Sequence, residues 1–262
     1  MSASLSEINV YPVKSAAGFP VESWPLDEFG LRFDRRWAVI DSTGVILTQR
    51  DYAAMALVRT SVRDDALRLE APGMPLLRLP LGSNGGSRLP VRIWKDVCEA
   101  ERSGPEADTW WSAYLGEPCH MVLMPDETLR PAGPGRVAFA DAYPFLVLSE
   151  GSVEALNSRL EWPVPMNRFR PTLVIADVEP HAEDTWAGFR IGGEAFAIDR
   201  GCDRCVVTTI DQATAARGTE PLRTLATYRR APDGRVLFGQ YARHLTRGHL
   251  TRGDAVVPEA RR

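Results

Sequence analysis

The sequence predicts a β-rich α+β protein with barrel-like sheets and few short helices. Short apolar segments recur along the chain between Pro and Gly residues. Three segments have helical periodicity, and strands and helices do not alternate as they do in parallel βαβ folds. The 262 residues are enough for one large β-rich domain or for two smaller domains. We expect two, residues 1–122 and residues 123–262.

In the N-terminal half, short strands are separated by turns. Residues 4–14 are predicted to form the first strand, and Lys14 and Ser15 lie in the turn that follows. Such a pair is either a solvated turn or a contact for an anion, because it places a point charge next to a hydroxyl group. Further short strands are expected from residue 55 to residue 94, and residues 106–115 are predicted to form a helix.

Two consecutive arginines lie in a predicted hairpin formed by residues 28–41 and 45–50. Because side chains alternate along a strand, Arg35 and Arg36 would point to opposite faces. One of them would then face inward or toward a cleft, where an unpaired cation is costly. An anionic ligand could be its partner, and so could an internal carboxylate such as Asp34.

The C-terminal half is predicted to mix strands and helices. Ser149 should cap a helix that continues to residue 160, and Thr219 should cap a shorter one. The β-branched segment at residues 206–210 is expected to form a strand. The other predicted strands of this half are residues 120–124, 145–148, 172–176, 189–191 and 195–198, one beginning at residue 238, and one over residues 250–257.

The net charge, the distribution of apolar residues and the absence of two motifs argue against several classes of function. The formal net charge is −3, with 31 basic and 34 acidic residues, so neither nucleic acid nor a membrane surface is expected as a partner. No signal peptide and no run of 18 apolar residues occurs, which predicts a cytoplasmic protein. The motifs Gly-x-Ser-x-Gly of serine hydrolases and Gly-x-Gly-x-x-Gly of dinucleotide-binding proteins are both absent.

The most informative chemical motif is the pair Cys202 and Cys205, which is flanked by Arg200 and Arg204. Nearby guanidinium groups favour the thiolate, the form of cysteine that binds metals and attacks electrophiles. A structural zinc site would need a second ligand pair, which the other cysteines and the four histidines do not supply. A thioredoxin-like dithiol would need a helix after the pair. A buried inert pair is the third possibility.

A further possibility is that a single thiolate binds a soft transition metal carried by a large anionic organic cofactor. Arginine and lysine side chains from separate segments would bind the phosphate of such a cofactor. Lys14, Arg35 and Arg170 are suitably dispersed along the chain.

Seven motifs, in this order, resemble those of the MOSC superfamily, which is named after the C-terminal domain of molybdenum cofactor sulfurase. The strongest resemblance within it is to the mitochondrial amidoxime-reducing component and its bacterial relatives, and it runs from Ile8 to about Val257. The motifs are Tyr-Pro-Val-Lys-Ser (11–15), Asp-Arg-Arg-Trp (34–37), Arg-Phe-Arg-Pro (168–171), Ala-Glu-Asp-Thr-Trp (182–186), Cys-Asp-Arg-Cys-Val-Val-Thr-Thr-Ile-Asp (202–211), Glu-Pro-Leu-Arg-Thr-Leu (220–225) and Phe-Gly-Gln-Tyr (238–241).

The resemblance implies a MOSC-type β-barrel domain packed with an N-terminal β-barrel-like domain. It also implies a molybdenum cofactor, with the metal held by the dithiolene of a pyranopterin and by one protein thiolate. Cys205 matches the metal-ligand and catalytic position, whereas Cys202 matches a position that does not bind metal. The residues implied in cofactor binding are Lys14, Ser15, Arg35, Asp141, Ala142, Arg170, Asp203, Arg204 and Tyr241.

The implied reaction is the two-electron reduction of small N-hydroxylated substrates, such as amidoximes and hydroxylamines, with the oxygen leaving as water. The chain lacks the cysteines of an appended 2Fe-2S domain and the membrane-anchoring segment of the mitochondrial proteins. We therefore expect a separate flavin or 2Fe-2S electron donor, no membrane association and a monomer.

Two alternatives to a reductase stay open. The first is a non-catalytic protein that carries or delivers the cofactor or sulfur. The second is a cofactor-free structural or interaction protein, in which Lys14, Arg35 and Arg170 would not converge on one cleft near Cys205.

Overall fold

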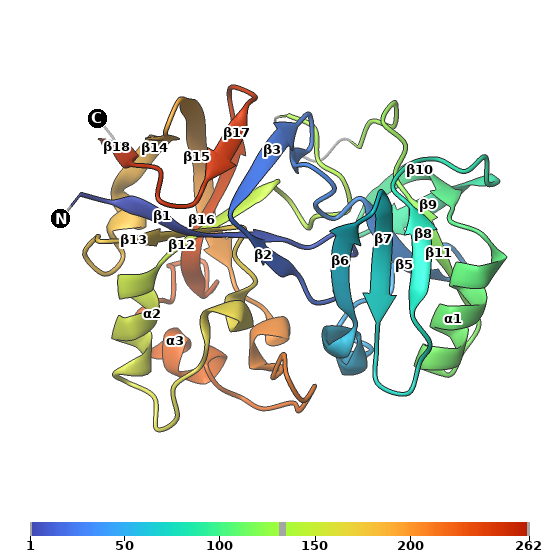
Figure 1. The fold of residues 1–262 in the computed structure, drawn as a ribbon. Coiled ribbons are helices and arrows are strands. Elements are labelled where there is room, and N and C mark those ends of the chain that lie inside the picture. The colour runs from blue at the N-terminus through green and yellow to red at the C-terminus, as the bar shows by residue number, and fades with distance from the viewer. Residues whose placement is uncertain (1, 131–134, 261–262) are drawn as a thin grey trace.

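A computed structural model describes residues 2–130 and 135–260 (Figure 1). It confirms the prediction of a β-rich α+β fold with few short helices. The elements fall into two parts that lie side by side in Figure 1. Strands β5 to β11 and helix α1 form one part. Strand β1, strands β12 to β18 and helices α2 and α3 form the other.

The strands are β1 (Ser4–Val10), β2 (Phe19–Val21), β3 (Ser23–Asp27), β4 (Gly30–Leu31), β5 (Trp37–Asp41), β6 (Arg59–Arg63), β7 (Ala66–Glu70), β8 (Leu77–Pro80), β9 (Arg88–Ile93), β10 (Asp96–Arg102), β11 (Cys119–Leu123), β12 (Phe145–Ser149), β13 (Leu173–Ala176), β14 (Trp186–Ile191), β15 (Glu194–Asp203), β16 (Leu237–His244), β17 (His249–Thr251) and β18 (Val256–Ala260). The α-helices are α1 (Pro105–Leu115), α2 (Glu150–Asn157) and α3 (Leu222–Tyr228). The 3₁₀ helices are η1 (Ala53–Leu57), η2 (Met166–Phe169), η3 (Ala182–Thr185) and η4 (Val206–Thr209).

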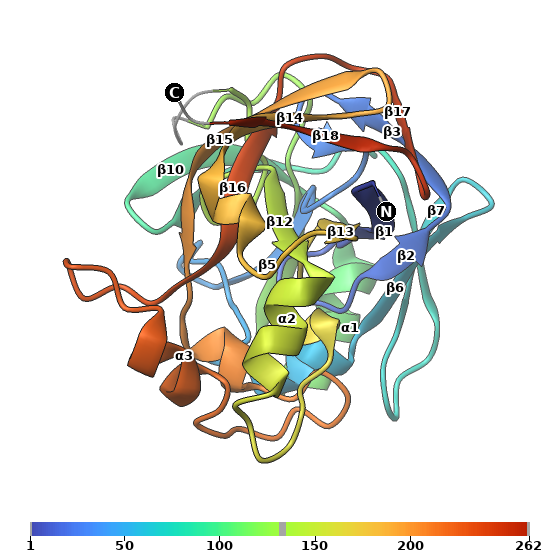
Figure 2. The same cartoon turned by 90° about the vertical axis from the view of Figure 1, so that its left-hand side faces the viewer.

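An eight-stranded sheet organises the C-terminal half, in the order β18-β14-β15-β16-β12-β13-β1-β2. Strands β12 and β13 are parallel, whereas β1 pairs with β13 in the antiparallel sense. The first strand of the chain thus belongs to the sheet of the second half. Phe145, Phe189 and Phe196 are fully or almost fully buried in the core of this sheet. Helices α2 and α3 pack below it through a separate apolar cluster (Figure 2).

The N-terminal half contains a four-stranded sheet, β5-β11-β10-β9, and a three-stranded sheet, β6-β7-β8. Helix α1 packs into their shared core through Trp111, which is fully buried beside Trp37 and Met121. A proline at the first turn of α1 and a left-handed Gly116 at its end account for the limits of this helix. The predicted helix at residues 106–115 is therefore confirmed.

The hairpin predicted around residue 44 is only partly correct. Strand β5 begins at Trp37, and residues 45 and 46 form isolated bridges rather than a strand. Arg35 precedes the strand with a φ of 49°, so strand alternation does not set its direction. The left-handed turn directs it instead, and Arg35 contacts Asp34 whereas Arg36 contacts Asp126.

Two local predictions in the C-terminal half are wrong. Residues 206–209 form the 3₁₀ helix η4 instead of a strand, because Thr208 donates both its backbone N–H and its hydroxyl to the carbonyl of Cys205. Thr219 does not cap α3. That helix begins after Pro221, and the Glu220 carboxylate accepts a hydrogen bond from the N–H of Thr224.

Other predictions for this half are confirmed. Ser149 caps α2 by accepting a hydrogen bond from the N–H of Ser152. Strands β14 and β15 form the predicted hairpin. The domain boundary at residues 122 and 123 stays a prediction. Among the described residues, no helix combines the length and the apolar character needed to cross a membrane.

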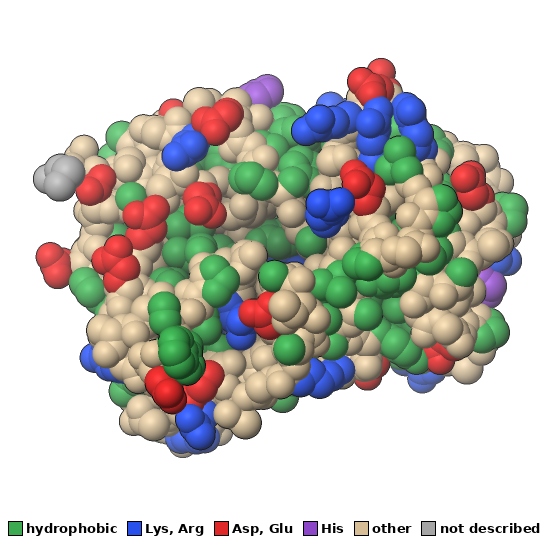
Figure 3. Space-filling view, turned by 60° about the horizontal axis from the view of Figure 1, so that its bottom comes forward, with side chains coloured by type: hydrophobic (Ala, Val, Ile, Leu, Met, Phe, Trp, Pro, Cys, Tyr) green, Lys and Arg blue, Asp and Glu red, His purple; other side chains and the backbone are tan. Residues whose placement is uncertain are grey.

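On the face shown in Figure 3, Lys and Arg side chains lie at several separate places, with Asp and Glu side chains between them.

Candidate functional site

Residues from both halves of the chain line one cavity of about 440 Å³. The ten residues predicted to form the site all line it: Lys14, Ser15, Arg35, Asp141, Ala142, Arg170, Asp203, Arg204, Cys205 and Tyr241. Lys14, Arg35 and Arg170 therefore lie in the same cavity as Cys205. This arrangement is the opposite of what the hypothesis of a cofactor-free structural or interaction protein predicts.

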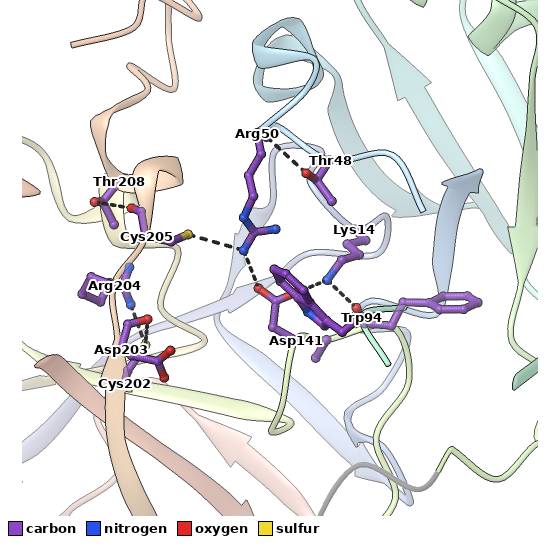
Figure 4. A network of polar contacts seen from close by, with 12 residues as sticks. Lys14, Thr48, Arg50, Trp94, Asp141, Cys202, Asp203, Arg204, Cys205 and Thr208 are labelled. Atoms are coloured by element: carbon purple, nitrogen blue, oxygen red, sulfur yellow. Dashed lines mark hydrogen bonds and ion pairs between the residues drawn. The ribbon is translucent and has the colours of Figure 1, made fainter. Parts of the chain in front are cut away.

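Cys205 lies at the end of a sheet strand, where β15 leads into η4. Its side chain is half-buried, and its sulfur lies 3.4 Å from Nη2 of Arg50 (Figure 4). The two hydrogen bonds that Thr208 donates to the carbonyl of Cys205 fix the backbone of this turn. The thiol is thus held at the cavity wall beside a guanidinium group that comes from the other half of the chain.

Asp141 is the centre of the polar network in Figure 4. Its carboxylate accepts from Nζ of Lys14 at 2.5 Å, from Nη2 of Arg50 at 3.3 Å and from Nε1 of Trp94 at 3.2 Å. Burial would raise the pKa of Asp141, but Lys14 and Arg50 outweigh it and hold this pKa well below the usual range. Burial lowers the pKa of Lys14, which also donates to the carbonyl of Phe139 at 2.8 Å.

Two arginines lie against the same aromatic ring. The guanidinium carbons of Arg35 and Arg170 are 4.2 Å and 4.5 Å from the ring centroid of Tyr11. Arg35 forms an ion pair with Asp34 at 2.6 Å. Burial lowers the pKa of Arg170 to about 10 and raises the pKa of Tyr11 to about 12. A second cation beside a buried arginine is unfavourable without an anion nearby.

Three residues that line the cavity have an unusual backbone conformation. Ser15, Arg35 and Arg170 have φ angles of 69°, 49° and 55°, in the left-handed region that non-glycine residues rarely adopt. Such conformations persist only where the surrounding structure holds them, and they cluster at functional sites.

The two cysteines of the Cys-x-x-Cys motif have different surroundings. Cys202 is buried, accepts a hydrogen bond from Nη1 of Arg204 at 3.0 Å and contacts Tyr241. Burial raises the pKa of the Cys202 thiol. Cys205 is the more accessible of the two, and the structure therefore separates the motif into a buried and a half-buried thiol.

The charges that line the cavity fit a large anionic group. Among the described residues, the lining contains seven Lys or Arg side chains and two Asp side chains. In the same part of the chain, neither Arg170 nor Arg204 forms an ion pair with a carboxylate, so no carboxylate neutralises either charge, although Arg204 donates to Cys202 and to the carbonyl of Phe169 and Arg170 donates to Gln212. The described residues contain no group of three His, Cys, Asp or Glu side chains placed to hold a metal ion. A structural zinc site needs four such ligands, whereas a metal that arrives bound to a cofactor needs one thiolate.

Sequence reasoning missed several lining residues. Arg50 and Trp94 are the most important, because both contact Asp141 and Arg50 also contacts Cys205. No spacing in the sequence connects them with a motif in the second half. Tyr143 and Arg168 are two others, whereas Arg200, which flanks the cysteine pair in the sequence, lines the cavity as well.

The loop that carries Arg50 is bound to the C-terminal half. The side-chain amides of Gln49 and Gln212 exchange two hydrogen bonds, at 3.1 Å and 3.0 Å. Arg217 donates from Nη2 to the backbone carbonyls of Gln49, Arg50 and Asp51. These contacts fix Arg50 opposite Cys205 and join the two halves beside the cavity.

Two protein-family models match the chain. The MOSC N-terminal beta barrel domain matches residues 2–118, and the MOSC domain matches residues 134–257.

Individual relatives are of two kinds. Mitochondrial amidoxime-reducing component 1 of Xenopus laevis is 31% identical, with 98% of this chain and 82% of that protein covered. The Homo sapiens protein of the same name is 32% identical, with 90% and 75% covered. Molybdenum cofactor sulfurase of Solanum lycopersicum is 35% identical, with 92% of this chain but only 33% of that protein covered. The chain thus spans about a third of the sulfurase and most of each amidoxime-reducing component. It belongs to the family of MOSC-domain proteins that carry an N-terminal β-barrel domain.

Proposed function

We propose that this protein is a molybdenum-cofactor-dependent oxidoreductase that reduces N-hydroxylated compounds such as amidoximes or hydroxylamines. The observation that carries the proposal is the convergence of Cys205 with lysine and arginine side chains from both halves on one cavity. The similarity to amidoxime-reducing components over nearly the whole chain supports the reaction class.

In this proposal, the side chains of the cavity have distinct tasks. The thiolate of Cys205 binds the metal. Lys14, Arg35 and Arg170 bind the anionic groups of the cofactor, as charged donors bind phosphate. Asp141 holds Lys14 and Arg50 in place through the contacts described above.

The cofactor, when bound, would supply the two electrons that cleave the N–O bond; of the two protons consumed, one goes to the hydroxyl oxygen, which leaves as water, and one goes to the nitrogen. The electrons come from a separate flavin or 2Fe-2S protein. In the cavity wall, the Arg50 guanidinium is a fixed positive charge near the sulfur of Cys205, and it can stabilise negative charge that develops there.

A second candidate is a carrier or delivery protein for the cofactor or for sulfur. The observation in its favour is the match to molybdenum cofactor sulfurases over 90% or more of this chain. Both candidates use the same cavity, but the carrier does not reduce substrate.

The test compares the wild type with Cys205→Ala, each purified from a molybdenum-replete host. Molybdenum is measured by mass spectrometry and pterin by the fluorescence of its oxidised form. We expect both in the wild type and a large loss of molybdenum in Cys205→Ala. Cys98→Ala is the matched control, because Cys98 is a buried cysteine in β10 and does not line the cavity.

Reduction of benzamidoxime with a chemically reduced dye as electron donor separates the two candidates. A wild type that contains molybdenum and reduces benzamidoxime supports the oxidoreductase. A wild type that contains the cofactor and reduces no N-hydroxylated compound supports the carrier. Equal molybdenum in the wild type and in Cys205→Ala contradicts the ligand assignment.

A further inference from the structure

An exposed tryptophan lies at the edge of the cavity. Trp94 is in the turn between β9 and β10, and its side chain is 59% exposed. Of the large hydrophobic residues that are exposed in the described part of the chain, Trp94 is the one that lines this cavity. Burial of so large an apolar surface is favourable, so an exposed indole at a cavity is a candidate ligand contact.

The orientation of this indole is fixed from several sides. Its Nε1 donates to the carboxylate of Asp141, and the guanidinium carbon of Arg50 lies 4.6 Å from its ring centroid (Figure 4). The backbone of Trp94 has a φ of 55°, which is unusual for a bulky residue. A strained, anchored and exposed ring is preorganised for contact with a ligand.

The indole is also close to the proposed chemistry. A single guanidinium group, that of Arg50, contacts both the Trp94 ring and the sulfur of Cys205. The charged side chains of the lining are mostly cationic and suit the cofactor. A neutral substrate that approaches Cys205 therefore meets a large flat apolar surface at Trp94.

We propose that Trp94 is a specificity-determining residue, and that its indole stacks on an aromatic ring of an N-hydroxylated substrate. This inference rests on the proposed function, because it takes the substrate to be an N-hydroxylated compound. Binding of such a compound at Trp94 can nevertheless be measured without the reaction. Aromatic rings stack in offset or edge-to-face arrangements, and a saturated group cannot replace that contact. The protein should therefore prefer aromatic substrates, such as aryl amidoximes, over small aliphatic ones.

The test measures binding of two neutral probes, benzamidoxime and acetamidoxime, to the molybdenum-loaded protein. Without an electron donor no turnover occurs, and isothermal titration calorimetry gives both dissociation constants. We expect Trp94→Ala to weaken benzamidoxime binding about five- to tenfold and to change acetamidoxime binding by less than about twofold. Trp162→Ala is the matched control, because Trp162 is 77% exposed and does not line the cavity.

A second variant guards against misfolding of Trp94→Ala. Trp94→Gly removes the same ring and suits a positive φ, and thermal unfolding shows which variant is intact. Unchanged benzamidoxime binding in the intact variant overturns the inference, and so does equal weakening of both probes.

Reduction assays with the same proteins keep the two ideas apart. If binding follows the expected pattern but no variant reduces either compound, the proposed function fails and the role of Trp94 stands. If reduction proceeds but binding does not depend on Trp94, the proposed function stands and this inference fails.

Discussion

Asp141→Asn tests how much the central carboxylate contributes to stability. The substitution keeps the shape of the side chain but removes the charge that Lys14 and Arg50 face at 2.5 Å and 3.3 Å. Removing one partner of a buried ion pair costs about 3–5 kcal/mol. Here the Asp141 side chain is 38% exposed, and Lys14 keeps its hydrogen bond to the carbonyl of Phe139. We therefore expect a loss of about 2 kcal/mol in the free energy of unfolding at pH 7.

The assay is urea denaturation of cofactor-free protein, together with thermal unfolding. For a chain of this size, a loss of 2 kcal/mol corresponds to a decrease of about 4–8 °C in Tm. Asp126→Asn is the control. It removes a carboxylate that lies 2.6 Å from Arg36, but the Asp126 side chain is 88% exposed. Exposed ion pairs contribute about 0–1 kcal/mol, so the control should lose less than half as much.

The pH dependence of stability tests whether the charge of Asp141 is the cause of the stability loss. The pKa of Asp141 is lower in the folded protein than its unfolded value of 3.8, so its charge stabilises the fold above pH 3.8. That stabilisation is lost as the pH falls toward the folded pKa. The difference in the free energy of unfolding between the wild type and Asp141→Asn should be about the same at pH 7 and pH 5, and it should be smaller at pH 3. A difference that stays constant to pH 3, or a control loss as large as that of Asp141→Asn, would refute the reasoning.

Two further substitutions test the scaffold of the site. Gly239→Ala places a Cβ 2.8 Å from a backbone carbonyl oxygen of β12, whereas Gly234→Ala, also at a positive φ, meets no atom within 4 Å. In urea denaturation we expect Gly239→Ala to cost at least about 2 kcal/mol more than Gly234→Ala, and equal losses would contradict the predicted clash. Glu183 is buried and accepts three hydrogen bonds from serine groups at the start of α2. Glu183→Ala should cost about 3–4 kcal/mol by the same measurement, and the exposed Glu154→Ala should change little; similar losses in both would count against this role.

The sequence indicated which residues line the cavity much better than how the backbone presents them. Lys14, Arg35 and Arg170 could be identified because they occur in ordered motifs, and all three line the cavity. The left-handed backbone that directs Arg35 and Arg170 was not predicted, because propensities assign such φ values to glycine.

Contacts across the two halves explain the residues that sequence reasoning missed. Arg50 contacts Cys205 from a loop whose residues 49–51 dock on Gln212 and Arg217 in the other half. Sequence periodicity describes neighbours along one element and contains no information about such docking.

The error at residues 206–209 has a local cause. A β-branched Val-Val-Thr-Thr segment favours a strand when it packs on a sheet. In this chain, the hydrogen bonds from Thr208 to the carbonyl of Cys205 offer the backbone an alternative, and a tight helical turn forms. This turn is what leaves the Cys205 thiol at the cavity wall instead of within a sheet.

The cavity draws its walls from both halves of the chain, so a ligand bound there acts as a clamp between them. A ligand that binds only while the two halves are in contact stabilises that contact by RT ln(1 + [L]/Kd). At a ligand concentration of 100 Kd, this stabilisation is about 2.7 kcal/mol. Separation of the halves would then become about a hundredfold rarer in the loaded protein than in the empty one. Protection of the amides in the Gln49 and Gln212 contact from hydrogen exchange would therefore report occupancy of the cavity without any turnover.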